Sequence, residues 1–132
     1  MINVENKVFS PIYTALTMQF SGIYVTSEPA SVPSKNLAAC IMQTDNYSSV
    51  GKQDNTLKEK FATVVFQVDV YSNQQTGKKS KCYEVMNVID EMLFEMNFMR
   101  IMTNPVPMED SGYYKLTARY RAETDGINFY RI

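Results

Sequence analysis

The stretch from Glu59 to Asn97 constrains the fold most strongly, because its hydrophobic pattern changes period part-way along. From Phe61 to Tyr71 the side chains alternate as they do in a strand with one buried face. The residues expected to face the core are Ala62, Val64, Phe66, Val68 and Val70. Apolar residues then recur at helical spacing at Cys82, Val85, Met86, Ile89, Met92, Leu93 and Met96. We therefore predict a strand followed by an amphipathic helix, over residues 77–96, that packs on it.

The remaining apolar segments predict a single α+β domain over residues 1–132. A stripe near the N-terminus repeats every four residues and consists of Val4, Val8, Ile12, Leu16 and Phe20. Ser10 followed by Pro11 suits an N-cap and a first helical residue, so a helix is predicted from Ser10 to Ser21, and the state of the residues before it is left open. Strands are predicted at residues 23–26, 37–44, 98–103 and 113–125, with residues 126–132 docking as an edge strand.

The segment from Asp45 to Lys58 is polar, lacks periodicity and joins two predicted strands. Loops of about 12 residues or more inside a domain are uncommon and are usually either functional or disordered. Two interpretations stay open, an arm that reaches a neighbouring subunit and an ordinary hairpin tip. On the first interpretation, the candidate contact residues are Tyr47, Val50, Lys52 and Leu57.

The sequence contains no histidine, and its two cysteines are Cys40 and Cys82. The commonest general base and the usual zinc ligands are therefore missing or scarce, and we expect no catalysis, no metal and no cofactor. Both cysteines fall at core positions of the pattern, so we interpret them as buried thiols rather than redox groups. Asp90, Glu91 and Glu95 form an acidic patch on the predicted solvent side of the helix, where a catalytic carboxylate pair is not expected.

The charge balance gives no overall attraction to nucleic acid or to an acidic membrane surface, because 13 basic and 14 acidic residues leave a net charge of -1. No apolar run approaches the ~20 residues of a membrane span, so we expect a cytoplasmic protein without membrane contact. Nine methionines and nine tyrosines favour a subunit that packs against other subunits. A coding bias toward AT-rich codons would give the same counts.

Two groups of basic residues are further candidates for contacts with a partner. Lys78, Lys79 and Lys81 stand at the predicted helix N-terminus, where positive charge opposes the helix dipole; they either contact an acidic partner or form a solvated end. Lys115, Arg119 and Arg121 lie on the polar face of the strand at 113–125. That strand is expected to pair with the strand at 61–71, where Asp69 would form a cross-strand charge pair with Arg119 or Arg121.

Several short segments occur in an order that resembles a known family. They are Glu59-Lys60-Phe61-Ala62, Val68-Asp69-Val70-Tyr71-Ser72-Asn73, Gly77-Lys78-Lys79, Val88-Ile89-Asp90-Glu91, Asn97-Phe98-Met99-Arg100 and Ala118-Arg119-Tyr120-Arg121-Ala122 with Asp125, and Asp45-Asn46 also fits. Together they resemble head-to-tail region proteins of long-tailed bacteriophages and prophages, in particular tail terminator (tail-completion) proteins. The likeness covers roughly residues 37 to 125. The sequence departs from the family at Asn97, a position often held by glycine, and at Asn36-Leu37, where an aromatic residue and a proline are frequent.

The resemblance implies an α+β subunit with a mainly antiparallel sheet and two helices packed on one face. It also implies a virion structural protein that closes into a ring, commonly a hexamer, on the tail tube, where it ends tube polymerisation and joins the tail to the head connector. The partners would be copies of the same chain, the tail tube protein and a neck protein, with DNA passing through the lumen without specific binding. The protein would lie in the host cytoplasm during assembly and then in the virion. The alternatives are a head-side neck or adaptor protein and, more distantly, a small non-phage binding module or enzyme.

Overall fold

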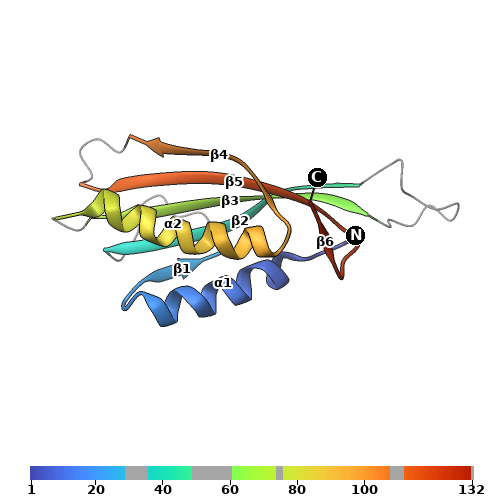
Figure 1. Ribbon diagram of the computed structural model, residues 1–132, viewed down its shortest axis with the longest axis horizontal. Coiled ribbons are helices and arrows are strands. Elements are labelled where there is room, and N and C mark those ends of the chain that lie inside the picture. The colour runs from blue at the N-terminus through green and yellow to red at the C-terminus, as the bar shows by residue number, and fades with distance from the viewer. Residues whose placement is uncertain (29–35, 49–60, 74–75, 108–111, 132) are drawn as a thin grey trace, which may run out of the picture.

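The computed structural model describes residues 1–28, 36–48, 61–73, 76–107 and 112–131, in which two helices pack on one face of a six-stranded sheet (Figure 1). The helices are α1 (Glu5–Gln19) and α2 (Lys78–Glu95). The strands are β1 (Tyr24–Thr26), β2 (Leu37–Ser48), β3 (Ala62–Ser72), β4 (Met99–Val106), β5 (Tyr114–Thr124) and β6 (Phe129–Tyr130). The predicted α+β class is confirmed.

The strand order is β1-β2-β3-β5-β4, with β6 paired to β5 just beyond the first residue of β4. Only the short β1–β2 pair is parallel among the described strands. Strand β3 therefore lies inside the sheet, as predicted, and β5 is its neighbour, with Gln67 opposite Arg119 and Asp69 opposite Thr117. The tail docks through β6, as its apolar composition predicts.

The core lies between the helices and one face of the sheet. Every second residue of β3 from Ala62 to Val70 is buried, and the facing residues of α2 are Cys82, Val85, Met86, Ile89 and Leu93. Phe66 meets Phe98 edge to face, with ring centroids 5.6 Å apart. The period of two in the strand and the helical period in α2 thus select the face that packs against the helices, with Met92 and Met96 only partly buried at its margin. The prediction that β3 has a single buried face is wrong, because Val65, Asp69 and Tyr71 on the opposite face are also buried.

Helix α1 begins five residues earlier than predicted, at Glu5, and carries Pro11 in its interior. Proline removes the amide that would bond the carbonyl of Lys7 and costs about 3 kcal/mol inside a helix. The first turn nevertheless forms, with the Val8 amide donating to the Val4 carbonyl at 3.2 Å. Val4 and Val8 are both buried, and burial of each side chain contributes about 1.5–3 kcal/mol, which offsets the proline.

Strand β2 continues to Ser48, so the prediction of a loop starting at Asp45 is wrong for its first four residues. A bulge between Gln43 and Asp45 shifts the register, after which residues 45–48 pair with residues 62–65 of β3. The pairing satisfies backbone groups of β3 that a loop would leave without ladder partners. Residues 49–58, with the candidates Val50, Lys52 and Leu57, lie outside the described residues.

Strand β4 also runs further than predicted, through Pro105 to Val106. Proline cannot donate a ladder hydrogen bond, but β4 is an edge strand, where one side of the backbone has no strand to bond. Between α2 and β4, Asn97 has a φ of 69°, in the left-handed region that asparagine tolerates better than most residues and glycine best.

Cys40 and Cys82 are both buried, as predicted, but on opposite faces of the sheet. Burial raises the pKa of the Cys82 thiol to about 12. Burial, and then the charge of Asp69, raise the pKa of Cys40 to about 11. Both side chains therefore stay protonated near neutral pH and act as thiol donors, Cys40 to the Glu28 carbonyl at 3.0 Å and Cys82 to the Tyr114 carbonyl at 3.4 Å.

Candidate interface on the back face of the sheet

The sheet face opposite the two helices, named the back face here, carries most of the predicted contact residues that the structure describes. In β5, Leu116, Ala118 and Tyr120 turn toward the helices and are buried. Lys115, Arg119 and Arg121 alternate with them and therefore point to the back face. The side chains that define this face are Ala38, Cys40, Met42, Asp45 and Tyr47 of β2, Thr63, Val65, Gln67, Asp69 and Tyr71 of β3, Lys115, Thr117, Arg119, Arg121 and Glu123 of β5, and Met99, Met102, Asn104 and Val106 of β4.

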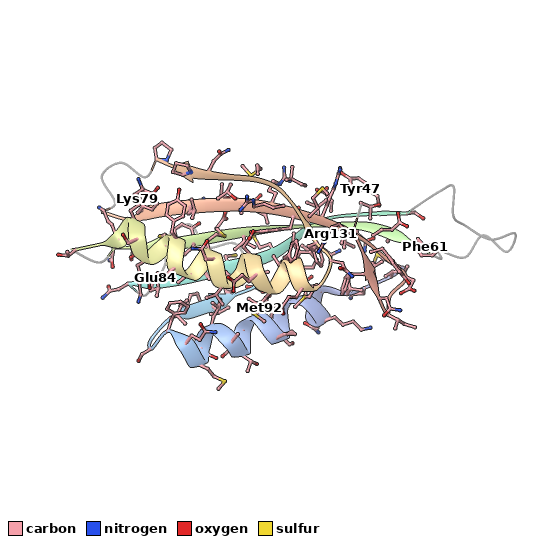
Figure 2. All side chains as sticks on the ribbon, in the orientation of Figure 1. Tyr47, Phe61, Lys79, Glu84, Met92 and Arg131 are labelled. Atoms are coloured by element: carbon pink, nitrogen blue, oxygen red, sulfur yellow. The ribbon has the colours of Figure 1, made fainter. Side chains whose placement is uncertain are left out.

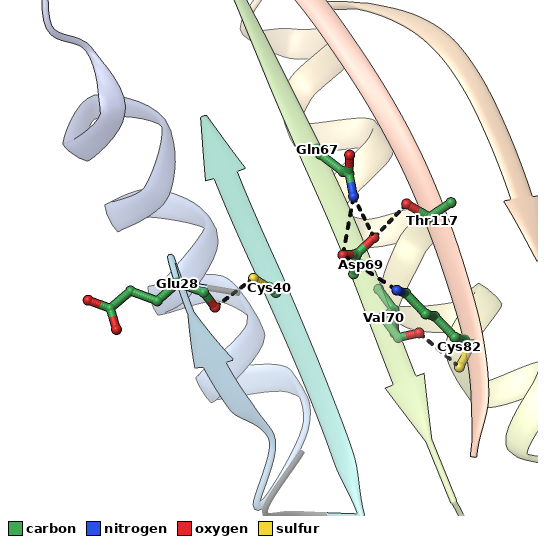
Figure 3. Close-up of polar contacts among 8 residues, drawn as sticks. Glu28, Cys40, Gln67, Asp69, Val70, Cys82 and Thr117 are labelled. Atoms are coloured by element: carbon green, nitrogen blue, oxygen red, sulfur yellow. Dashed lines mark hydrogen bonds and ion pairs between the residues drawn. The ribbon is translucent and has the colours of Figure 1, made fainter. Parts of the chain in front are cut away.

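A buried carboxylate lies in the middle of the back face (Figure 3). Asp69 is 4% exposed and accepts a short hydrogen bond from the Thr117 hydroxyl. The Gln67 amide donates to both of its oxygens at 3.3 and 3.4 Å, and the Lys115 ammonium lies 4.0 Å away. The predicted pair of Asp69 with Arg119 or Arg121 is wrong, because Lys115 and Thr117 take up this carboxylate instead.

Lys115 also contacts an aromatic ring, since its ammonium lies 5.2 Å from the ring centroid of Tyr71. Burial raises the pKa of Tyr71, while Lys115 acts in the opposite direction. The half of the back face near the β3 C-terminus is thus an internally paired polar cluster. Its charges already have partners within the chain.

The other half of the back face holds positive charge that is less completely paired. Arg119 lies 3.8 Å from Asp45, its side chain is 43% exposed, and its buried Nε atom has no hydrogen-bond acceptor among the described residues. Arg121 is exposed and forms no ion pair with any residue in the described ranges. Met102 lies opposite Arg119 and Met99 opposite Arg121, so adaptable apolar side chains line this basic area.

The predicted lysine cluster lies elsewhere. Lys79 is at the start of α2, and Tyr47 is near the end of β2. The two residues lie at opposite ends of the molecule (Figure 2). Lys81 pairs with Glu84 at 3.4 Å and lies over the Phe20 ring at 5.2 Å, while Lys78 donates to the Gly112 carbonyl at 3.4 Å. The cluster therefore does not join Tyr47 in one patch, and it lies at the helix side of the molecule, whereas Lys115, Arg119 and Arg121 lie on the back face. Tyr47 itself lies on the back face, across from Thr63, and is 58% exposed.

The outer side of α2 is a second charged surface that the sequence reasoning treated only as a solvated acidic patch. Glu84, Glu91 and Glu95 are exposed along it, and Phe94 is 60% exposed beneath the guanidinium of Arg131, 4.1 Å from the ring centroid. Asp90 turns inward and binds two partners, the Tyr120 hydroxyl at 2.8 Å and Arg100 at 3.4 Å. Burial and then Asp90 raise the pKa of Tyr120, so this hydroxyl remains a donor. The signal in the sequence was the recurrence of acidic residues at helical spacing opposite the apolar stripe.

No protein-family model matches the chain, and no curated protein sequence matches it. Within the described ranges, no three histidine, cysteine, aspartate or glutamate side chains gather where they could hold a metal ion. Of the two helices described, neither combines the length and the apolar character that crossing a bilayer requires.

Proposed function

We propose that this chain is a tail terminator of a long-tailed bacteriophage or prophage, which caps the tail tube as a ring, ends its polymerisation and joins the tail to the head connector. The observation that carries the proposal is the division of the sheet into one face covered by helices and a back face with exposed charged, aromatic and methionine side chains. A subunit that works by packing against copies of itself and against neighbours needs such a surface.

The segments that resemble the tail terminator family support the proposal, because several of them form one continuous unit. Residues 68–73 are the end of β3, Gly77-Lys78-Lys79 starts α2, and residues 97–100 lead from α2 into β4. Gly77 has a φ of +76°, which lets the chain turn sharply from the strand into the helix. Residues 118–122 lie in β5, whose Arg119 and Arg121 are on the back face.

The proposed function requires position and shape rather than reaction. A sheet backed by two helices is a stiff plate, and plates arranged around an axis leave a central opening through which DNA could pass. The ring then acts by occupying the end of the tube, so that no further tube subunit can add. Its opposite rim presents a surface to the head connector.

Tube growth tests the proposal directly. The tail tube protein of the same phage or prophage is polymerised with and without this chain, and tube lengths are measured by electron microscopy. We expect growth to stop at amounts of the chain far below those of the tube protein, because one ring suffices for each tube end. The heat-unfolded chain at the same concentration is the control.

Two outcomes would contradict the proposal. Tubes that keep growing with the folded chain present at their ends would show that it does not terminate them. Binding to the head connector without any effect on tube length would favour a head-side neck protein instead.

A further inference from the structure

Two rows of opposite charge lie on opposite sides of the molecule. The acidic row is on the outer side of α2 and consists of Glu84, Glu91 and Glu95. The basic row is on the back face and consists of Lys115, Arg119 and Arg121 of β5, of which Lys115 lies 4.0 Å from Asp69 and Arg119 lies 3.8 Å from Asp45. Glu91, Glu95 and Arg121 form no ion pair within the described part of the chain, so their charges remain available to an outside partner.

The two rows run in the same order along the molecule. Near the start of α2, the Cys82 thiol reaches the Tyr114 carbonyl at 3.4 Å, and further along Asp90 binds the Tyr120 hydroxyl at 2.8 Å. Helix α2 and strand β5 therefore advance in the same direction, as Figure 1 also shows. Because Arg119 and Arg121 flank Tyr120 and point to the other face, they lie level with the Asp90–Glu91 part of the helix.

The rows are of comparable length, although the residues at one end of each, Glu84 and Lys115, already have partners in Lys81 and Asp69. From Glu84 to Glu95 the helix rises about 16 Å at 1.5 Å per residue. From Lys115 to Arg121 the strand rises about 20 Å at about 3.3 Å per residue. A second copy displaced across the thickness of the molecule would thus bring its acidic row over the basic row of the first.

We propose that the outer side of α2 in one copy docks on the back face of the next copy, with Glu91 and Glu95 meeting Arg119 and Arg121. The inference rests on the proposed ring and names the surfaces that build it. The occupant is a second copy of this chain because the two rows belong to the same molecule, carry opposite charge and run in the same direction over comparable lengths. A sheet with helices on one side then gains a helix layer on the other.

Apolar side chains beside the two rows fit such a contact. Met99 is 39% exposed beside Arg121, and Phe94 is 60% exposed beside Glu95, so each charged row has an apolar neighbour. The half of the back face with Cys40, Asp69 and Tyr71 is already buried within the chain, so the contact uses the half with Arg119 and Arg121.

This contact joins two different surfaces, so it is heterologous. Repetition of a heterologous contact closes into a ring when each step includes a suitable rotation. Every copy then uses both rows, and a change in either row should break the same contact. A charge reversal in one row should therefore be rescued by the opposite reversal in the other row. A variant that merely damaged folding would not be rescued in this way.

The test reverses one charge in each row. Glu91→Arg and Arg121→Glu are each expected to raise the concentration at which half of the chain is assembled by at least about ten-fold, since like charges then face each other. The double variant E91R/R121E is expected to assemble within about three-fold of the wild type, and an equimolar mixture of the two single variants is expected to co-assemble. Sedimentation velocity measures assembly, and thermal unfolding verifies that each variant is folded.

Lys79→Glu is the matched control, because it makes the same kind of charge change at the far end of α2 and should leave assembly unchanged (Figure 2). Single variants that assemble like the wild type, or a double variant that stays dissociated, would overturn the docking arrangement while leaving the proposed function intact. A wild-type chain that never assembles would instead count against the ring itself.

Discussion

Replacing Phe66 by alanine should lower the free energy of unfolding by about 3–5 kcal/mol. The Phe66 side chain is completely buried in the central strand β3 and packs edge to face against Phe98. The variant loses the free energy that the native protein gains by moving the ring out of water. It also leaves a cavity between the sheet and α2. Aromatic contacts of this geometry contribute about 0.5–1.5 kcal/mol beyond area burial. Chemical denaturation followed by circular dichroism measures the change.

Phe94→Ala is the matched control for Phe66→Ala, because it removes the same atoms from a side chain that is 60% exposed on α2. Its loss should stay below about 1 kcal/mol, most of it from the contact with Arg131. Equal losses in the two variants would show that the core does not lie where the alternation of β3 places it.

Replacing Ile89 by alanine should cost about 2–5 kcal/mol, because Ile89 is fully buried on the side of α2 that faces the sheet. The Asn87→Ala control lies on the exposed side of the same helix and should change stability by less than about 0.5 kcal/mol. A loss below 0.5 kcal/mol for Ile89→Ala would mean that the helix face is assigned wrongly.

The β3–α2 unit was predictable from the sequence because burial alone determines it. Every second residue from Ala62 to Val70 is apolar and the α2 stripe has the helical period, so the pattern identifies the face of β3 that packs on the helix. It does not predict the burial of Val65 and Tyr71 on the other face. The start of α1 was not predictable in this way. Pro11 is a strong local signal, but the burial of Val4 and Val8 outweighs it, and that burial depends on tertiary contacts.

The ends of β2 and β4 were missed because sheet position overrides local composition. Asp45 to Ser48 are polar, yet they pair with β3 once the bulge shifts the register. Pro105 predicts the end of a strand, but β4 is an edge strand, where a residue without a backbone amide hydrogen is tolerated. Neither the register nor the edge position is visible in a single sequence.

The candidate interface was only partly predictable, for similar reasons. Alternation in β5 was enough to place Lys115, Arg119 and Arg121 on one face. The choice of partner for Asp69 depends on the reach of individual side chains, which brings Lys115 to it and Arg119 to Asp45. The common direction of α2 and β5, which aligns the back face with the outer side of α2, could not be predicted. It follows from the contacts of Asp90 with Tyr120 and of Cys82 with Tyr114, which join residues 30 or more positions apart.

The mass of the wild-type chain in solution tests the central claim most directly. Light scattering after size-exclusion chromatography, over a hundred-fold range of concentration, compares that mass with the 15.1 kDa of one chain. The ring predicts a closed particle of a fixed multiple of this mass, six-fold for a hexamer, that does not grow further as the concentration rises. A mass of one chain at every concentration would contradict the ring and the function proposed for it.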